Sequence, residues 1–201
     1  MDKYKKLAAK LKDMLRASYP DIDVRVEAWS RDPSRAAIYF VSSKFAVLYP
    51  KQRYHYLLPL IPQDFYETHL ANAVWFELAP GESPGDLDYP DEELTKQISP
   101  TVMKCVEASG FFKGLDDVFC PGNPAAPRAK CHRDFRVSKE LLTKHGFEEK
   151  DLSDVFHVLM AKGGFCDCEI LYNVVEESRL KAEYWKARAE GRKPKDPHGA
   201  S

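Results

Sequence analysis

The sequence predicts an α+β protein: a small domain with the element order helix, strand, strand, helix, helix, strand, followed by a mainly helical unit with one short extended segment. Three observations indicate this class. Apolar residues recur at helical spacing near the N-terminus and over much of the last third of the chain. Two runs within residues 22–42 alternate apolar and polar side chains, as half-buried strands do. A stretch rich in proline, glycine and acidic residues, at 79–95, separates the two parts.

An amphipathic helix and a hairpin open the chain. The helix is predicted over residues 3–17, where the apolar positions form one face: Tyr4, Leu7, Ala8, Leu11, Met14 and Leu15. Pro20 follows closely and cannot continue the helix. Alternating residues then predict a strand at 22–29 and another at 36–42, joined by the turn residues "SRDPSR". We expect these two strands to pair.

Two short helical pieces and a third strand complete the small domain. Pro59 and Pro62 fall inside the helical stretch 49–70, and each removes a backbone donor, so two short pieces are expected rather than one long helix. Pro50 suits the first turn of the first piece, because the N–H group that it lacks has no helical partner there. Aromatic and β-branched residues predict a third strand over 72–78.

This order resembles a BolA domain, a small α+β fold related to KH domains. The resemblance also includes "FVSSKF" at the end of the second strand, "QRYHYL" one helical turn further on, and a last strand that runs into "APGE". It implies that Arg53 and His55 lie in a basic patch and are candidate partner-binding residues; a solvated helix face is the alternative interpretation. It places Asn72 where the family has a histidine that helps to hold an iron–sulfur cluster, and asparagine is a poor iron ligand.

Four parts are expected along the chain. The first is a BolA-like domain at 1–80, and the second is an acidic linker with a connecting helix at 81–112. A unit that carries a cysteine motif follows at 113–176, and a charged helix with a disordered tail ends the chain at 177–201. The acidic residues of the linker are typical of a solvated loop. The helix that follows Asp91 is expected to be interrupted by Pro100.

The cysteine unit is expected to open with a long irregular loop at 113–130. A helix capped by Ser138 is predicted to end at Gly146, and a second helix is predicted to end at Gly163. The bulky and β-branched residues of "FCDCEILYNV" predict that this segment is extended.

The stretch "GGFCDCEIL" contains the strongest chemical signal in the sequence. In a regular strand Cys166 and Cys168 would face the same way, with their β-carbons ~7 Å apart. Two thiolates that bind one zinc ion at ~2.3 Å must bring their sulfurs within ~4 Å, so the backbone must bend. Gly163 and Gly164 supply the backbone freedom that a bend needs. The pattern therefore predicts a metal site, with zinc ahead of iron or an iron–sulfur cluster.

A complete tetrahedral site needs ligands from elsewhere in the chain. Cys131 and His132 in "KCHRDF", and Cys120 in the loop before them, are the candidates. Cys120 would complete a set of four thiolates, whereas His132 or His157 would give three thiolates and one imidazole. Inert buried thiols and a thiol redox pair are the alternatives. Cys105 is expected to be a buried thiol within a helix.

Residues 131–174 resemble an uncharacterised bacterial domain family. Its signature is an early Cys-x-His, followed by Gly-Gly-x-Cys-Asp-Cys-Glu and Asn-Val. "GGFCDCEILYNV" matches the second part closely, whereas Arg133 occupies the position of the family's histidine and His132 precedes it. The resemblance implies a fold unit and no particular reaction.

Composition narrows the function. A net charge of −1 does not favour binding to nucleic acid, and no apolar run is long enough to cross a membrane. Five cysteines without an export signal indicate the cytoplasm. The chain lacks a nucleophile elbow, a phosphate-binding glycine loop and a zincin helix, which does not favour an enzyme. We expect a non-catalytic cytoplasmic protein with a zinc site that acts through a protein partner. A thiol redox or iron–sulfur-related protein and a nucleic-acid-binding module are the alternatives.

Overall fold

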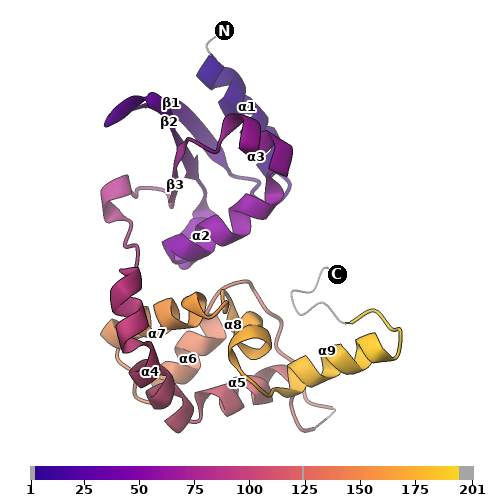
Figure 1. The fold of residues 1–201 in the computed structure, drawn as a ribbon. Coiled ribbons are helices and arrows are strands. Elements are labelled where there is room, and N and C mark those ends of the chain that lie inside the picture. Colours follow the sequence, from indigo (N-terminus) through magenta and orange to yellow (C-terminus); the bar gives the residue numbers. More distant parts are fainter. Residues whose placement is uncertain (1–2, 124, 195–201) are drawn as a thin grey trace. The chain divides into compact units, whose positions relative to one another are not determined.

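The computed structural model describes residues 3–123 and 125–194 (Figure 1). The chain divides into two compact units, Met1–Tyr89 and Pro90–Ser201. The first contains a three-stranded sheet with helices and the second is mostly helical, which confirms the mixed α+β class. Most of the tail that was predicted to be disordered, residues 195–201, lies outside the described residues. No described helix combines the length and the apolar character that crossing a membrane requires.

The first unit has the predicted order of elements. Its helices and strands are α1 (Lys3–Leu15), β1 (Asp23–Trp29), β2 (Asp32–Val41), α2 (Pro50–Leu57), α3 (Gln63–His69) and β3 (Val74–Leu78). Pro50 is the first residue of α2, and a short 3-10 turn separates α2 from α3, so the prolines divide this region into two helical pieces as expected.

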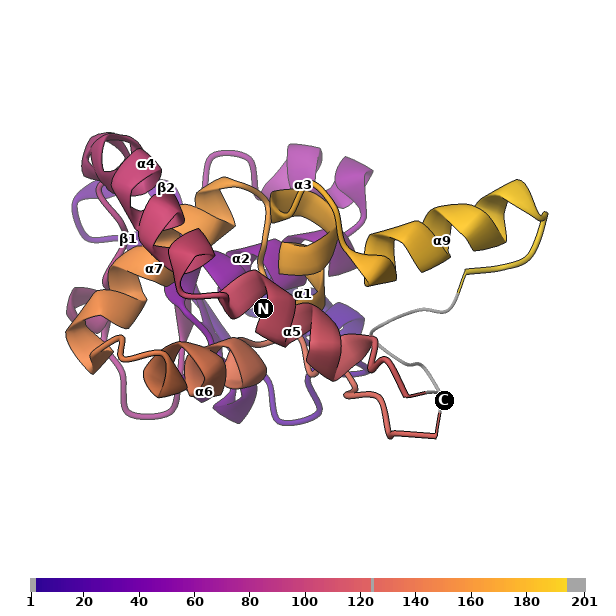
Figure 2. The same cartoon turned by 90° about the horizontal axis from the view of Figure 1, so that it is seen from below.

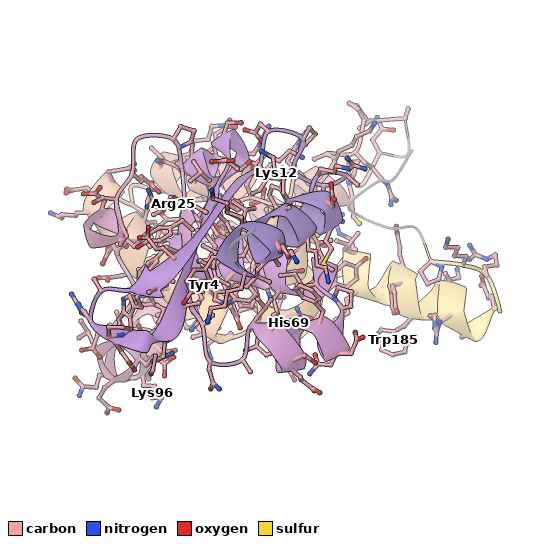
Figure 3. All side chains as sticks on the ribbon, turned by 90° about the horizontal axis from the view of Figure 1, so that it is seen from above. Tyr4, Lys12, Arg25, His69, Lys96 and Trp185 are labelled. Atoms are coloured by element: carbon pink, nitrogen blue, oxygen red, sulfur yellow. The ribbon has the colours of Figure 1, made fainter. Side chains whose placement is uncertain are left out.

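The sheet of the first unit has the strand order β1-β2-β3. β1 and β2 form the predicted antiparallel hairpin, whereas β3 lies parallel to β2. Leu11 and Leu15, one turn apart on α1, are fully buried in a core that also contains Ile38 and Phe40 of β2. Figure 3 shows α1 in front of the strands, with the exposed Lys12 on the helix. The apolar face predicted for α1 is therefore the face that covers the sheet.

Arg53 is a buried structural residue of the first unit. Its side chain is buried, and its guanidinium donates to the carbonyl oxygens of Leu48 and Glu77 at 2.9 and 2.8 Å. It also forms a bidentate ion pair with Glu82, at 2.5 and 2.9 Å. The interpretation of a solvated face is therefore wrong for Arg53, because this side chain fastens α2 to the end of β3 and the following turn. His55 is partly exposed, with its ring edge-on to a neighbouring tyrosine.

The second unit consists of helices and turns. They are α4 (Glu92–Ala108), α5 (Phe111–Phe119), α6 (Arg136–Lys144), α7 (Glu149–Ala161), α8 (Asp167–Glu169), the π-helical turn η4 (Ile170–Val174) and α9 (Arg179–Ala189). α4 packs along α7 (Figure 2). The rings of Phe135 and Phe156 stack at 4.4 Å between their centroids, which joins the start of α6 to α7.

Three predicted features of the second unit are corrected. Pro100 lies inside α4, which continues through it, because packing against α7 offsets the one backbone hydrogen bond that proline removes. The loop predicted at 113–130 begins only after α5, whose buried residues recur every four positions: Phe111, Leu115 and Phe119. Ser138 does not cap α6, because the helix begins at Arg136 and Ser138 is buried in its first turn.

Candidate metal centre

Three buried cysteines converge in the second unit. The Sγ atoms of Cys131, Cys166 and Cys168 all lie within 4.8 Å of one another. The sulfurs of Cys166 and Cys168 are 3.3 Å apart. Two thiolates on one tetrahedral zinc would lie ~3.8 Å apart, given zinc–sulfur bonds of ~2.3 Å. The cluster could therefore hold a metal ion with only small movements of its side chains.

The chain reaches this geometry by a route that differs from the predicted one. Cys166 has extended backbone angles (φ −156°, ψ 172°) and precedes the first turn of α8, which contains Cys168. The expectation of an extended "FCDCEILYNV" is wrong from Asp167 onward, since this part is helical. The sulfurs approach each other because the backbone changes from extended to helical between them, whereas a flat strand would hold the side chains apart.

Gly163 and Gly164, which precede the cysteines, have different structural roles. Gly163 has a positive φ of 87° and ends α7, as predicted. The N–H of Gly163 donates to the carbonyl of Met160, and the N–H of Gly164 donates to that of Leu159, both at 3.0 Å. This is the paired hydrogen-bond pattern of a Schellman cap. Gly164 also lies directly against η4, with no room for a side chain.

Substitution of Gly164 by alanine is expected to destabilise the protein by about 1–3 kcal/mol, as overpacking does in a filled interior. A Cβ atom there would lie 2.9 Å from Val174 Cγ2, 3.0 Å from Ile170 Cγ1 and 3.3 Å from the backbone Cα of Ile170. Urea unfolding of Gly164→Ala measures the loss. Gly122→Ala is the control, because its Cβ would meet nothing within 4 Å. Equal stability of both variants would contradict the close approach.

Asp167, between the two cysteines, holds the ligand-bearing segments together. Its carboxylate accepts hydrogen bonds from the backbone N–H groups of Val137 (3.1 Å) and Ser138 (2.9 Å), in the first turn of α6. Its own N–H donates to the carbonyl of Asp134 at 3.1 Å. Burial raises the pKa of Asp167 to about 6, although the hydrogen bonds from α6 favour the carboxylate. The residue therefore acts as a helix cap supplied from a distant part of the chain.

A backbone N–H group near Cys131 points at the sulfur of this residue. Arg133 adopts a left-handed conformation, with φ 62°, which is uncommon outside glycine. In this conformation its N–H group donates to Cys131 Sγ at 3.5 Å. Such a donor favours the thiolate form that a metal requires. The carboxylate of Asp134, which is itself buried, accepts hydrogen bonds from Arg136 and so orders the same turn.

The electrostatics of the cluster favour a bound cation. The pKa values of Cys166 and Cys168 are both raised, first by their hydrogen bonds with the Cys131 thiol and further by burial. Several buried thiolates at such short range repel one another. A cation at their centre removes this repulsion, so metal binding and thiol deprotonation would be coupled.

Other predicted ligands lie outside this cluster. Cys120 is buried, and its pKa is raised to about 11 by burial and by the nearby Glu183. His132 is exposed and His157 is buried in α7. Among residues 3–123 and 125–194, only the three cysteines named above form a converging ligand group. Cys105 is exposed on α4, so the expectation that it is buried is wrong.

Comparison with known proteins identifies the segment that carries the cluster. Residues 123–173 match a family model described as a protein of unknown function, DUF2695. The matched segment includes all three converging cysteines and covers about a quarter of the chain. Comparisons with curated proteins and with solved structures gave no match. The BolA-like resemblance of the first unit therefore stays a prediction.

Proposed function

We propose that Cys131, Cys166 and Cys168 bind a zinc ion with a structural or regulatory role, in a protein that acts through a protein partner and not as a catalyst. The observation that carries this proposal is the convergence of three buried sulfurs from two segments that are far apart in sequence. Soft thiolates select zinc over oxygen-binding cations such as Mg²⁺ or Ca²⁺. None of the five cysteines, all of which lie among the described residues, forms a disulfide, which supports a reducing, cytoplasmic setting.

Burial supports a structural or regulatory metal over a catalytic one. Cys166 and Cys168 have no exposed surface, and Cys131 is only 5% exposed. A catalytic zinc keeps a position open to substrate or water, whereas structural sites are enclosed by their ligands. The proposed partner contact is His55 on α2, because it is partly exposed. Arg53 does not take this role, since its guanidinium is used inside the first unit.

Thiol redox chemistry is the second candidate. The 3.3 Å between the sulfurs of Cys166 and Cys168 favours it. The raised pKa values of both thiols oppose it, because the thiolate is the reactive form. Mild oxidation followed by mass spectrometry separates the two candidates. Loss of two hydrogens per chain, blocked by the cysteine substitutions and unaffected by zinc, would favour the redox candidate.

Metal content provides the direct test of the zinc proposal. Protein purified without chelator is expected to contain about one zinc ion per chain by elemental analysis, since the described part of the chain contains a single converging ligand group. Cys166→Ser and Cys168→Ser are expected to lose the metal. Cys105→Ser is the matched control and should retain it, because Cys105 lies exposed on α4. Metal-free wild-type protein that folds normally, even after incubation with zinc, would refute the proposal.

A comparison of zinc affinity between variants assigns the fourth ligand. His132 is next to Cys131 in sequence and exposed, and Cys120 is buried in the same unit, so both stay proposed ligands. Zinc affinity is compared in His132→Ala and Cys120→Ser. A weaker affinity in one variant alone identifies that residue. Unchanged affinity in both assigns the position to solvent or to a partner.

A further inference from the structure

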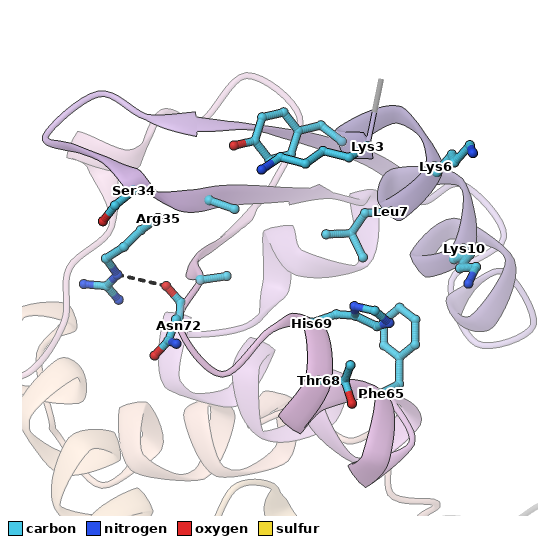
Figure 4. A pocket seen from close by; sticks show the side chains of 13 residues that line it. Lys3, Lys6, Leu7, Lys10, Ser34, Arg35, Phe65, Thr68, His69 and Asn72 are labelled. Atoms are coloured by element: carbon cyan, nitrogen blue, oxygen red, sulfur yellow. Dashed lines mark hydrogen bonds between the residues drawn. The ribbon is translucent and has the colours of Figure 1, made fainter. Parts of the chain in front are cut away.

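A cavity of about 440 Å³ opens in the first unit, far in sequence from the cysteines. Side chains from α1, from the start of β2 and from the end of α3 line it (Figure 4). Its walls combine two kinds of surface, a set of cationic groups and an apolar floor with aromatic rings.

Positive charge gathers around this cavity. Four cationic side chains line it and no carboxylate does: Lys3, Lys6, Lys10 and Arg35. Lys12, further along α1, forms an ion pair with Asp23 at 3.2 Å. By contrast, Lys6 and Lys10 have no carboxylate partner within residues 3–123 and 125–194. The whole chain has a net charge of −1, so the cavity is a local positive region in a nearly neutral protein. Such a region attracts anions.

Arg35 is held in a fixed orientation at one end of the cavity. Its Nε donates to the backbone carbonyl of Asn72 at 2.9 Å (Figure 4). Its guanidinium also lies over the ring of Trp29, 5.3 Å from the centroid. The Asp32 carboxylate, which accepts a hydrogen bond from Ser34 Oγ at 2.6 Å, also attracts this guanidinium. A planar guanidinium that is oriented in advance suits the bidentate recognition of a phosphate group.

The floor of the cavity suits a flat ring. Leu7 points between α1 and α3, above Phe65 and His69 (Figure 4). The rings of Phe65 and His69 meet edge-on, with centroids 4.7 Å apart, which steadies the Phe65 ring. Tyr4 adds a second aromatic side chain to the lining. Aromatic and aliphatic surfaces of this kind stack against planar heterocycles.

We propose that this cavity binds a nucleotide-class ligand, that is, a small molecule with a planar heterocycle and one or more phosphate groups. The heterocycle rests on the floor formed by Leu7 and Phe65. The phosphates meet Arg35 and Lys3, whereas Lys6 and Lys10, at the other end of the cavity, add to its positive charge (Figure 4). Polar side chains of the rim provide hydrogen-bonding groups for the sugar or the ring edge: Ser34, Thr68 and Asn72. The volume of the cavity is that of a small-molecule site. The site is independent of the metal centre.

Calorimetric titration of the full chain with ADP tests the proposal. ADP is expected to bind saturably, at about one molecule per chain, and at least tenfold more tightly than either adenosine or pyrophosphate. This expectation follows because each of those probes uses only one of the two surfaces. Arg35→Gln and Lys3→Ala are each expected to weaken ADP binding by about tenfold or more, the size of one lost charge-assisted contact.

Lys5→Ala is the matched control, because Lys5 is exposed on α1 but does not line the cavity. It removes the same charge and should change the Kd for ADP by less than about twofold, as a residue that makes no contact does. The proposal is overturned if ADP shows no saturable binding at millimolar concentration. It is equally overturned if Lys5→Ala weakens binding as much as Lys3→Ala, or if pyrophosphate binds as tightly as ADP. Tighter binding of a single-stranded oligonucleotide would replace the small-molecule ligand with a nucleic acid.

Discussion

Chelation of the metal is expected to lower the free energy of unfolding of the second unit by about 4 kcal/mol, when the loaded protein is held at a free zinc concentration a thousandfold above its dissociation constant. The reason is mass action. The proposed ligands come from the turn before α6 and from the start of α8, and the unfolded chain does not hold these segments together. Urea unfolding with zinc and with chelator measures the difference.

Two variants make this result specific to the cluster. Cys168→Ser should unfold as easily as the chelated wild-type protein and should be insensitive to chelator. Cys105→Ser should respond to chelator as the wild-type protein does, since its thiol lies outside the cluster. Wild-type protein that unfolds at the same urea concentration with and without zinc would contradict a structural metal.

Substitution of Glu77 by glutamine is expected to stabilise the first unit by about 3 kcal/mol at pH 8, the equivalent of the change in pKa between the unfolded and folded states. Glu77 is only 1% exposed on β3, and its Oε1 atom has no hydrogen-bond partner among the described residues. Burial raises its pKa from 4.5 to about 7, although Arg53 and Tyr89 favour the carboxylate. Glutamine keeps the shape of the side chain and carries no charge.

The pH dependence follows from the direction of the shift. Between pH 4.5 and about 7 the folded protein binds the Glu77 proton more tightly than the unfolded chain does. The stability that comes from this group is therefore complete below pH 4.5 and is lost as the pH rises through 7. We expect wild-type protein and Glu77→Gln to have similar stability at pH 4.5 and to diverge above it. Urea unfolding across this range measures the difference.

The exposed Glu67 on α3 provides the control for this experiment. Glu67→Gln makes the same change at an exposed position, so its stability should stay within about 0.5 kcal/mol of the wild-type protein across this range. Parallel stability curves for wild-type protein and Glu77→Gln would show that the buried carboxyl does not titrate as described.

Local patterns were sufficient to predict most of the first unit. The spacing of Leu11 and Leu15, the alternation in the two hairpin strands and the positions of the prolines each act over a few residues and predict elements that the structure contains. The turn was predicted too long, because β2 already begins at Asp32. The burial of Arg53 could not be predicted in this way, because its partners Glu77 and Glu82 are more than twenty residues away in the sequence. A helical pattern does not show whether such a cation meets water or a carboxylate.

The cysteine segment shows how distant contacts can override local preference. The residues after Asp167 favour an extended chain by type, yet they form α8 and η4. Contacts that are remote in sequence favour the helical form. The carboxylate of Asp167 binds the first turn of α6, and Gly164 lies against Ile170. The residues of the segment itself give no indication of these contacts.

The candidate site could be predicted only in part for the same reason. The C-x-C spacing and the two glycines identified Cys166 and Cys168 from a few neighbouring residues. The choice among Cys120, Cys131 and His132 depends on how the chain packs between residues 120 and 166, which spacing does not determine. The left-handed Arg133, which aims a backbone donor at Cys131, had no sequence signal, because arginine rarely adopts that conformation.

The anchoring role of Asp167 bears on how quickly the centre can exchange its ion. Its carboxylate fastens the Cys166–Cys168 turn to α6 through protein atoms alone. The sulfurs are therefore preorganised, and an incoming ion needs to displace protons but not to recruit loose segments. Uptake and release of the proposed ion would then be reversible steps on a framework that is already folded.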